Sequence, residues 1–128
     1  MEEIVRQFKA FSDGTRLRIL HLLLRGELCI CELMDVLELT QSKVSRHMAY
    51  LKNAGLVKDR REGVWIHYSL TEPRNKIHAS QLRCLAECFE DNEVLKRDDE
   101  RLGVLRGEKT EGTGLSESAG EELPIELL

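Results

Sequence analysis

The spacing of the apolar residues changes along this chain from a helical period to a period of two. Up to residue 53, apolar side chains recur three and four positions apart, as they do on one face of an α-helix. From residue 56 to residue 70, β-branched and aromatic residues form two short runs on either side of Gly63. This change predicts a helical body followed by a β-hairpin. Only 5% of the residues are aromatic, which favours a core of aliphatic side chains on packed helices.

Capping residues divide the helical part into segments. We expect a helix over 2–11, a second capped by Ser12 or Asp13 and ended by Gly26, a third over 30–37, a fourth from the N-cap Thr40 to residue 53, and a last helix from Pro73 to residue 95. Gly55 follows the fourth helix as its left-handed residue. The loop of the hairpin is expected at residues 61–63. The fold class is therefore mainly α with a small β-hairpin.

The net charge of −4 lies at the C-terminal end of the chain. Residues 103–128 have two basic and six acidic side chains, which account for the whole net charge. This segment is rich in Gly, Ser and Glu, and it has too few large apolar side chains to offset the entropy of ordering. We expect one folded domain at 1–102 and an acidic tail at 103–128, disordered over 103–122.

Residues 40–61 have six basic side chains and one acidic side chain, inside a domain with no net charge. Such a patch can bind phosphate groups whatever the total charge of the chain. No stretch approaches the roughly 20 apolar residues that cross a bilayer. The first residues also lack the basic and apolar regions of a secretory signal. We therefore expect a cytoplasmic protein that binds no membrane.

A short helix, a turn, a second helix and a basic hairpin follow one another in the layout of a winged helix-turn-helix. The second helix of such a unit fits the major groove of DNA and points its first residues at the base edges. The alternative, a merely solvated helix face, leaves the basic hairpin unexplained. The predicted DNA-binding residues are Thr40, Gln41, Ser42, Lys43, Ser45, Arg46, His47, Arg60 and Arg61.

Several segments closely resemble the ArsR/SmtB family of metal-responsive repressors, and in particular repressors of arsenical-resistance operons. They are Asp13–Leu20, Glu27–Leu33, Gln41–Leu51, Ala54–Val57, Arg61–Gly63 and Tyr68–Leu70. The resemblance covers about residues 4–90. It implies a homodimer, joined through its first and last helices, that leaves its operator when an ion binds. The operator of such a dimer is expected to be an imperfect palindrome.

Cys29 and Cys31 are the sharpest candidates for an inducer site, because thiolates are soft donors that select soft ions. Two positions apart on a helix, their side chains would point about 200° away from each other. Both sulfurs could then reach one ion only where the helix opens. We therefore expect binding to distort the start of the third helix and to shift the fourth helix on DNA. The alternative is that both cysteines are buried core residues.

In arsenical sensors of the family, this motif binds trivalent arsenic or antimony, so the resemblance implies Cys29 and Cys31 as ligands. The third cysteine of those sensors falls on Met34, whose neutral thioether is a poor substitute. The third coordination position stays open to a small thiol, hydroxide or a cysteine from elsewhere. A repressor of the same fold that senses cadmium, lead, zinc or thiol oxidation is the alternative. A thiol enzyme or a metal carrier leaves the polar fourth helix unexplained, so we expect no enzyme.

Cys84 and Cys88 lie one helical turn apart and share a face of the last predicted helix. That face also carries apolar residues, which favours packing at a dimer interface. A role as additional metal ligands is the second interpretation of this pair.

Overall fold

The computed structural model describes residues 1–108, so most of the predicted tail lies outside the described residues. The helices are α1 (Glu2–Phe11), α2 (Gly14–Leu23), α3 (Ile30–Leu37), α4 (Gln41–Asn53), α5 (Lys76–Glu87) and α6 (Glu93–Leu105). The strands are β1 (Leu28–Cys29), β2 (Val57–Glu62) and β3 (Trp65–Leu70). None of these helices is both long and apolar enough to cross a bilayer.

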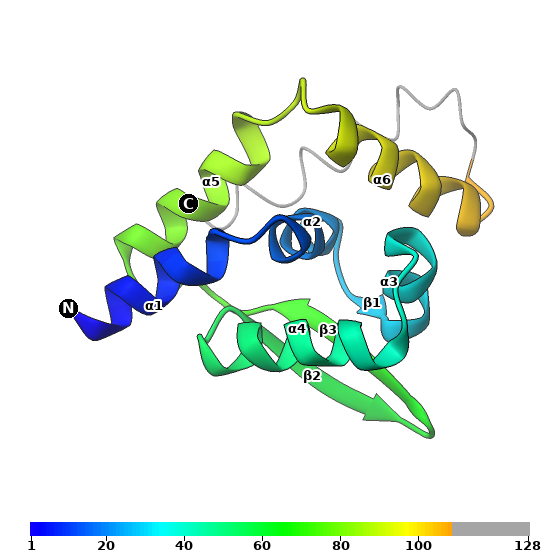
Figure 1. The fold of residues 1–128 in the computed structure, drawn as a ribbon, viewed down its shortest axis with the longest axis horizontal. Helices are drawn as coiled ribbons and strands as arrows, with labels where there is room; N and C mark the ends of the chain where they lie inside the picture. The colour runs from blue at the N-terminus through cyan, green and yellow to red at the C-terminus, as the bar shows by residue number, and fades with distance from the viewer. Residues whose placement is uncertain (109–128) are drawn as a thin grey trace.

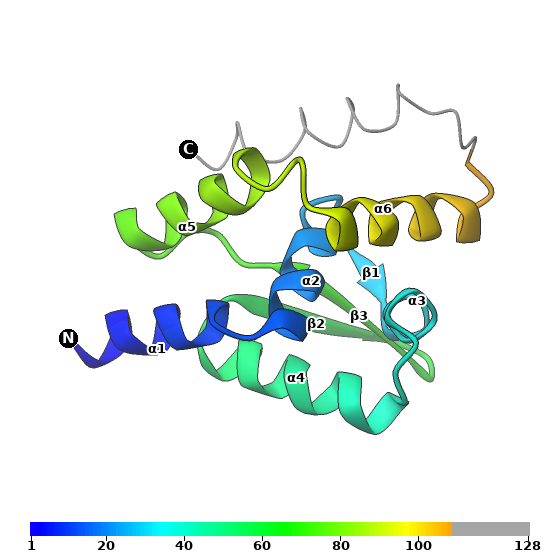
Figure 2. The same cartoon turned by 45° about the horizontal axis from the view of Figure 1, so that its top comes forward.

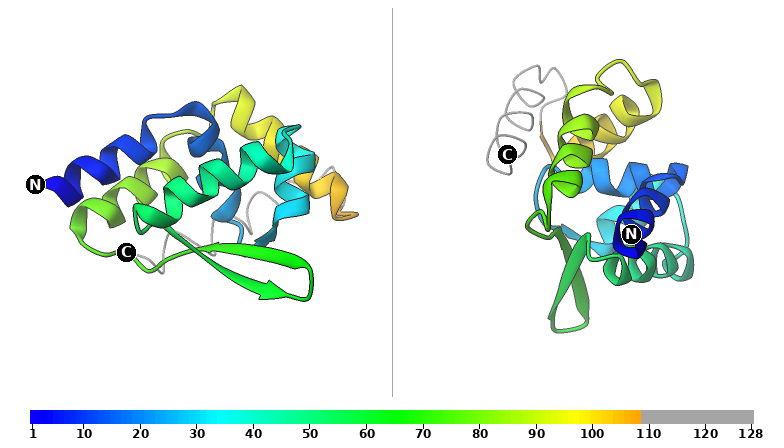
Figure 3. Two further views of the ribbon diagram at one scale, coloured as in Figure 1. Left: turned by 60° about the horizontal axis from the view of Figure 1, so that its bottom comes forward. Right: turned by 90° about the vertical axis from the view of Figure 1, so that its left-hand side faces the viewer.

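Helix α2 lies at the centre of the molecule, with the other helices and the sheet around it (Figures 1 and 2). Helices α1 and α5 lie at one end, while α3 and β1 lie at the other. The hairpin of β2 and β3 projects away from the helical body (Figure 3). The core is formed by aliphatic side chains that are almost wholly buried, including Ile19, Leu20, Leu22, Leu33, Val44, Leu51 and Leu56.

The helix-turn-helix consists of α3 and α4, which pack against each other. Helix α4 buries Val44, Met48 and Leu51, at the helical spacing that the sequence predicts. It begins where the Thr40 side chain accepts a hydrogen bond from the backbone N–H of Lys43 at 3.3 Å. Its opposite face remains open to solvent. The predicted winged helix-turn-helix is therefore confirmed.

The sheet is antiparallel, with the strands in the order β1-β3-β2. The hairpin closes with Glu62 opposite Trp65, so its turn contains only Gly63 and Val64. The predicted loop at residues 61–63 is wrong, because the strand pairing continues through Glu62. Gly63 starts this tight turn with a φ of +65°, which an L side chain rarely adopts. Strand β1 adds only two residues at the edge of the hairpin.

The prediction of one helix from Pro73 to residue 95 is also wrong, because two helices occupy this segment. Helix α5 begins after Asn75, whose side chain accepts from the His78 N–H at 2.8 Å. Helix α6 begins after Asn92, whose side chain accepts from the Leu95 N–H at 3.0 Å. Each asparagine satisfies a backbone donor that a helix start would otherwise leave free.

Helix α6 packs across α2 and α3 and ends at Leu105, three residues beyond the expected domain boundary. Asp98 of α6 is fully buried and receives two hydrogen bonds from the Arg18 guanidinium, at 2.8 and 2.9 Å. Leu102 is also fully buried. The boundary at residue 102 therefore falls inside a packed helix, since α6 continues through residues 103–105.

Candidate nucleic-acid interface and thiol site

The N-cap and the first two turns of α4 present a polar and basic surface. Five of the predicted DNA-binding residues there are exposed: Thr40, Gln41, Ser42, Lys43 and Arg46. Within residues 1–108, neither Lys43 nor Arg46 forms an ion pair, so both cations are available to phosphate or to base edges. The core-facing side of α4 holds this surface in place.

Two other predicted residues of α4 are less accessible. Ser45 and His47 are half-buried. His47 faces Asp13, the residue that caps α2, with its Nδ1 at 4.0 Å from a carboxylate oxygen. His47 is therefore less accessible to DNA than the exposed residues of α4.

The wing presents its two predicted arginines differently. Arg61 is exposed and has no ion-pair partner among residues 1–108. The Arg60 guanidinium instead binds both carboxylate oxygens of Glu27, at 2.8 and 2.9 Å. This contact lowers the pKa of the Glu27 carboxyl. It joins the wing to the residue that stands two positions before Cys29.

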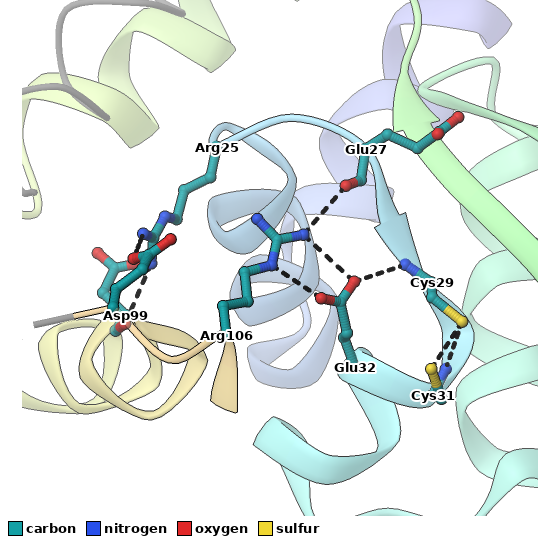
Figure 4. Close-up of polar contacts among 8 residues, drawn as sticks. Arg25, Glu27, Cys29, Cys31, Glu32, Asp99 and Arg106 are labelled. Atoms are coloured by element: carbon teal, nitrogen blue, oxygen red, sulfur yellow. Dashed lines mark hydrogen bonds and ion pairs between the residues drawn. The ribbon is translucent and has the colours of Figure 1, made fainter. Parts of the chain in front are cut away.

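Cys29 and Cys31 lie much closer together than a position within one helix allows. Cys29 precedes α3 as its N-cap, with extended backbone angles (φ −73°, ψ 148°), and Cys31 lies in the first turn. Their sulfur atoms are 2.7 Å apart (Figure 4). The expectation that the two side chains diverge is wrong, because the helical rotation does not apply across a cap. The alternative of two core cysteines is also wrong, since Cys29 is buried but Cys31 is exposed.

Both residues also take part in capping α3. The Cys29 sulfur accepts from the Cys31 N–H at 3.3 Å, and the Glu32 carboxylate accepts from the Cys29 N–H at 2.9 Å. This reciprocal pair is a capping box with cysteine in the place of serine or threonine. Local desolvation, the hydrogen bond to Cys29 and the nearby charge of Glu32 raise the pKa of the Cys31 thiol to about 11. The Cys31 thiol is therefore protonated near neutral pH.

The thiol site is connected to both parts of the winged helix. Cys29 ends strand β1 and pairs with His67 of the wing strand β3. It also starts α3, which packs on α4. A displacement of Cys29 would therefore shift both the wing strand β3 and the start of the helix-turn-helix. The sequence did not reveal the connection to the wing, because β1 is only two residues long.

Cys84 and Cys88 are both exposed, near the end of α5. Desolvation and a hydrogen bond to Cys88 raise the pKa of the Cys84 thiol. Helix α5 lies on the other side of α2 from β1 and α3 (Figures 1 and 2). Within residues 1–108, no group of three or more His, Cys, Asp or Glu side chains is arranged to hold a metal ion. The two cysteine pairs therefore remain separate in one chain.

Glu32 and Arg106 contact the thiol site but were not predicted as part of it. The Arg106 guanidinium binds Glu32 at 2.8 Å (Figure 4). The Cys-x-x-Glu spacing of a capping box could have pointed to Glu32. Nothing comparable pointed to Arg106, because its position depends on how α6 packs.

Comparison with known sequences matches residues 13–59 to the family described as "Bacterial regulatory protein, arsR family". The arsenic resistance transcriptional regulator ArsR1 of Pseudomonas putida is 53% identical over 64 residues, which are 49% of this chain and 50% of that protein. The arsenical resistance operon repressor of Bacillus subtilis is 37% identical over 82 residues, or 62% of this chain and 78% of that protein. A CadC homolog of Staphylococcus aureus, named a cadmium resistance regulatory protein, is 40% identical over 75 residues, or 58% of this chain and 62% of that protein.

The matched part of this chain spans 50% of the Pseudomonas putida regulator and 58% of the arsenical resistance operon repressor of Escherichia coli. Among solved structures, the homodimeric winged helix-turn-helix DNA-binding domain Mb0332 of Mycobacterium bovis superposes with a TM-score of 0.58 at 29% identity. That match covers 72% of this chain and 86% of the Mycobacterium bovis domain. The sequence, the fold and these relatives agree that the chain belongs to the ArsR family of DNA-binding bacterial regulators.

Proposed function

We propose that this chain is a dimeric transcriptional repressor, which leaves its operator when trivalent arsenic or antimony binds Cys29 and Cys31. The observation that carries the proposal is the position of the two thiols, at the junction of the wing and the helix-turn-helix. The relatives named as arsenic and arsenical resistance regulators support the same inducer.

The proposed dimer joins two copies through α1 and α5. Helix α1 leaves Val5 and Phe8 exposed, at 42% and 56%, which is unusual for large apolar side chains on a lone helix face. The homodimeric relative from Mycobacterium bovis supports this assembly. Helix α6 packs on α2 and α3 of its own chain, so the role first expected of the last helix falls to α5. Two copies of α4, about one helical turn of DNA apart, would read an imperfect palindrome.

DNA recognition is assigned to the first turn of α4 and to the wing. The Gln41 amide can pair with adenine, and the Arg46 guanidinium can pair with guanine or hold a phosphate. Gln41→Ala or Arg46→Ala should weaken operator binding by about 1–3 kcal/mol for each lost base contact. The matched control is Lys52→Ala, near the other end of α4, where the ammonium binds Asp59 at 3.0 Å. Unchanged operator affinity in both variants would show that α4 is not the reading helix.

Release begins with a condensation that needs no oxidant or reductant. Each thiol of Cys29 and Cys31 replaces one hydroxide of As(OH)₃, so that two As–S bonds form and two As–O bonds break. The two thiol protons leave with the hydroxides as two molecules of water. The sulfur pair at 2.7 Å, with Cys31 at the surface, suits such two-point binding.

The same step removes an interaction that holds α3. The Cys29 sulfur accepts the Cys31 N–H in the absence of inducer, and a bond to arsenic takes that sulfur away from the cap. Loss of an N-cap destabilises the start of a helix by about 0.5–2 kcal/mol. The change passes to α4 through α3, and to the wing through the pairing of Cys29 with His67.

The test of this inducer is release of a labelled operator, measured by fluorescence anisotropy, on titration with arsenite, antimonite, cadmium, lead and zinc. The proposal requires arsenite and antimonite to release DNA at the lowest concentrations. Release by cadmium, lead or zinc alone would favour the second candidate, a divalent-metal sensor, which the similarity to the Staphylococcus aureus protein supports. Release only by peroxide would identify a thiol-oxidation sensor.

A further inference from the structure

The C-terminal end of α6 reaches the thiol site through one side chain. Arg106 caps the end of α6, and its Nε and Nη2 donate to the two Glu32 carboxylate oxygens, at 2.8 and 3.2 Å. Its Nη2 also donates to the backbone carbonyl of Glu27 at 3.3 Å. The guanidinium therefore holds the segment on both sides of Cys29 (Figure 4).

The chain of contacts continues from Arg106 to the thiols. Glu32 uses the carboxylate that Arg106 binds to accept the Cys29 N–H at 2.9 Å. The ion pair is partly shielded, since the side chains of Arg106 and Glu32 are 31% and 20% exposed. Fork-like charge-assisted hydrogen bonds of this kind fix orientation as well as distance. The backbone that carries the first sulfur is thus held by a charged pair from another helix.

Other contacts fix Arg106 in its place. Helix α6 is anchored by the buried Asp98 and by Leu102. Just beyond it, the Arg25 guanidinium binds Glu108 at 2.9 Å. Arg106 is therefore presented by an ordered helix end on an anchored helix, and its contact with Glu32 requires little further ordering.

Resting on the proposed function, we infer that Arg106 is a positioning residue of the thiol site, and that α6 thereby raises the affinity of the Cys29–Cys31 pair for trivalent arsenic. Two-point binding costs less ordering when both sulfurs lie on one side of the cap before the first bond forms. Groups held in that arrangement beforehand bind more tightly than groups that must be ordered on binding. Glu32 and Arg106 hold the backbone of Cys29 in this arrangement before the inducer binds.

The probe for this inference is phenylarsine oxide, which condenses with two thiols to give two As–S bonds and one molecule of water. Its dissociation constant is measured by equilibrium competition with a small dithiol, on the full-length chain with Cys84→Ser and Cys88→Ser as the common background, so that Cys29 and Cys31 are the remaining thiols. Partners that orient ligands typically change affinity 10- to 100-fold when removed. We expect Arg106→Gln and Glu32→Gln each to raise the dissociation constant about tenfold. The double variant should be no worse than either single variant.

Arg101→Gln is the matched control, because Arg101 of α6 binds Glu38 at the opposite end of α3, at 2.9 Å. Thermal unfolding separates positioning from stability. Both arginine variants should lower the melting temperature slightly, but only Arg106→Gln should weaken probe binding. Arg106→Lys keeps the positive charge but lacks the two-donor guanidinium, so it should restore probe binding in part. It also provides a second test if Arg106→Gln fails to fold.

Two results would overturn the inference. One is the same dissociation constant for Arg106→Gln, Arg101→Gln and the unaltered chain. The other is an equal loss of affinity in both arginine variants, since this would reflect general loosening of α6. The proposed function fails separately, when Cys29→Ser binds the probe as tightly as the unaltered chain.

Discussion

Replacing Asp98 with alanine should destabilise the protein strongly, because it leaves a charge without its partner. Asp98 is fully buried, and the Arg18 side chain is 24% exposed. Two hydrogen bonds join them, at 2.8 and 2.9 Å. They connect positions 80 residues apart in sequence and hold α6 to α2. Asp98→Ala removes both bonds and leaves the Arg18 guanidinium in a partly apolar environment.

The magnitude follows from the burial of the pair. Removing one partner of a buried ion pair typically costs about 3–5 kcal/mol. Arg18 retains some contact with water, so the cost should lie at or below the bottom of that range, and we expect a loss of about 2–3 kcal/mol in the free energy of unfolding. Glu100→Gln is the control, since it removes the same formal charge from an exposed position of α6. A surface change of this kind should stay within about 0.5 kcal/mol.

The measurement is urea denaturation followed by circular dichroism, at one protein concentration because dimerisation adds to the apparent stability. The urea concentration at the unfolding midpoint should fall for Asp98→Ala, with little change in how steeply the free energy of unfolding depends on urea. A loss below about 0.5 kcal/mol, equal to that of Glu100→Gln, would refute the reasoning. Helix α6 would then contribute little to the stability of the fold.

Three further predictions concern the C-terminal end of α6, the turn at Gly55 and the buried imidazole of His78. Removing residues 109–128 should leave the melting temperature unchanged, whereas removing residues 103–128 should lower it clearly, since the second deletion cuts into α6. Equal melting temperatures for the two deletions would contradict the role of residues 103–105 in α6. Gly55→Ala should cost about 1 kcal/mol or more in urea denaturation, because Gly55 has a φ of +80° and a Cβ there would lie 2.6 Å from the Arg74 side chain; unchanged stability would contradict the left-handed assignment. Burial, and next the charge of Arg74, lower the pKa of His78, so the unfolded chain binds a proton at His78 more readily than the folded chain does. The His78 contribution to the free energy of unfolding should therefore be fully present near pH 7 and be lost towards pH 5, and the loss of stability should be shallower in His78→Gln. An identical fall in both proteins would exclude His78 as a source of the acid sensitivity.

Helix α4 could be predicted from sequence because local signals and packing agree there. Thr40 caps α4, Val44 and Met48 recur at helical spacing, and Gly55 ends the segment in the left-handed conformation. Each of these signals acts over only a few residues. The same agreement made the start of α3 and the hairpin predictable, apart from the length of its turn.

The thiol geometry differs from the expectation, because the expected divergence applies only when both cysteines lie within one helix. Moving Cys29 from the first turn to the cap changes two diverging side chains into a pair with sulfurs 2.7 Å apart. The helix expected over 30–37 already leaves Cys29 outside it, but cysteine is not a usual N-cap residue, so a cap formed by its sulfur is not an obvious expectation. Glu32, three positions later, was the available signal.

The predictions for the last helix and for Arg106 fail for different reasons. Apolar residues continue beyond α5 at Phe89, Val94 and Leu95, so the apolar content alone merges two helices into one. The cap at Asn92 marks the break. Arg106 was assigned to the acidic tail because composition describes a segment and not its contacts. Its bond to Glu32 exists only once α6 has folded against α2 and α3.

The most direct measurement is arsenite-driven release of a labelled operator from two paired-cysteine variants. Cys29→Ser with Cys31→Ser should bind the operator like the unaltered chain but keep it bound at every arsenite concentration. Cys84→Ser with Cys88→Ser should release it like the unaltered chain. Release that is abolished by the Cys84 and Cys88 changes, and untouched by the Cys29 and Cys31 changes, would contradict the assignment of the inducer site to the start of α3.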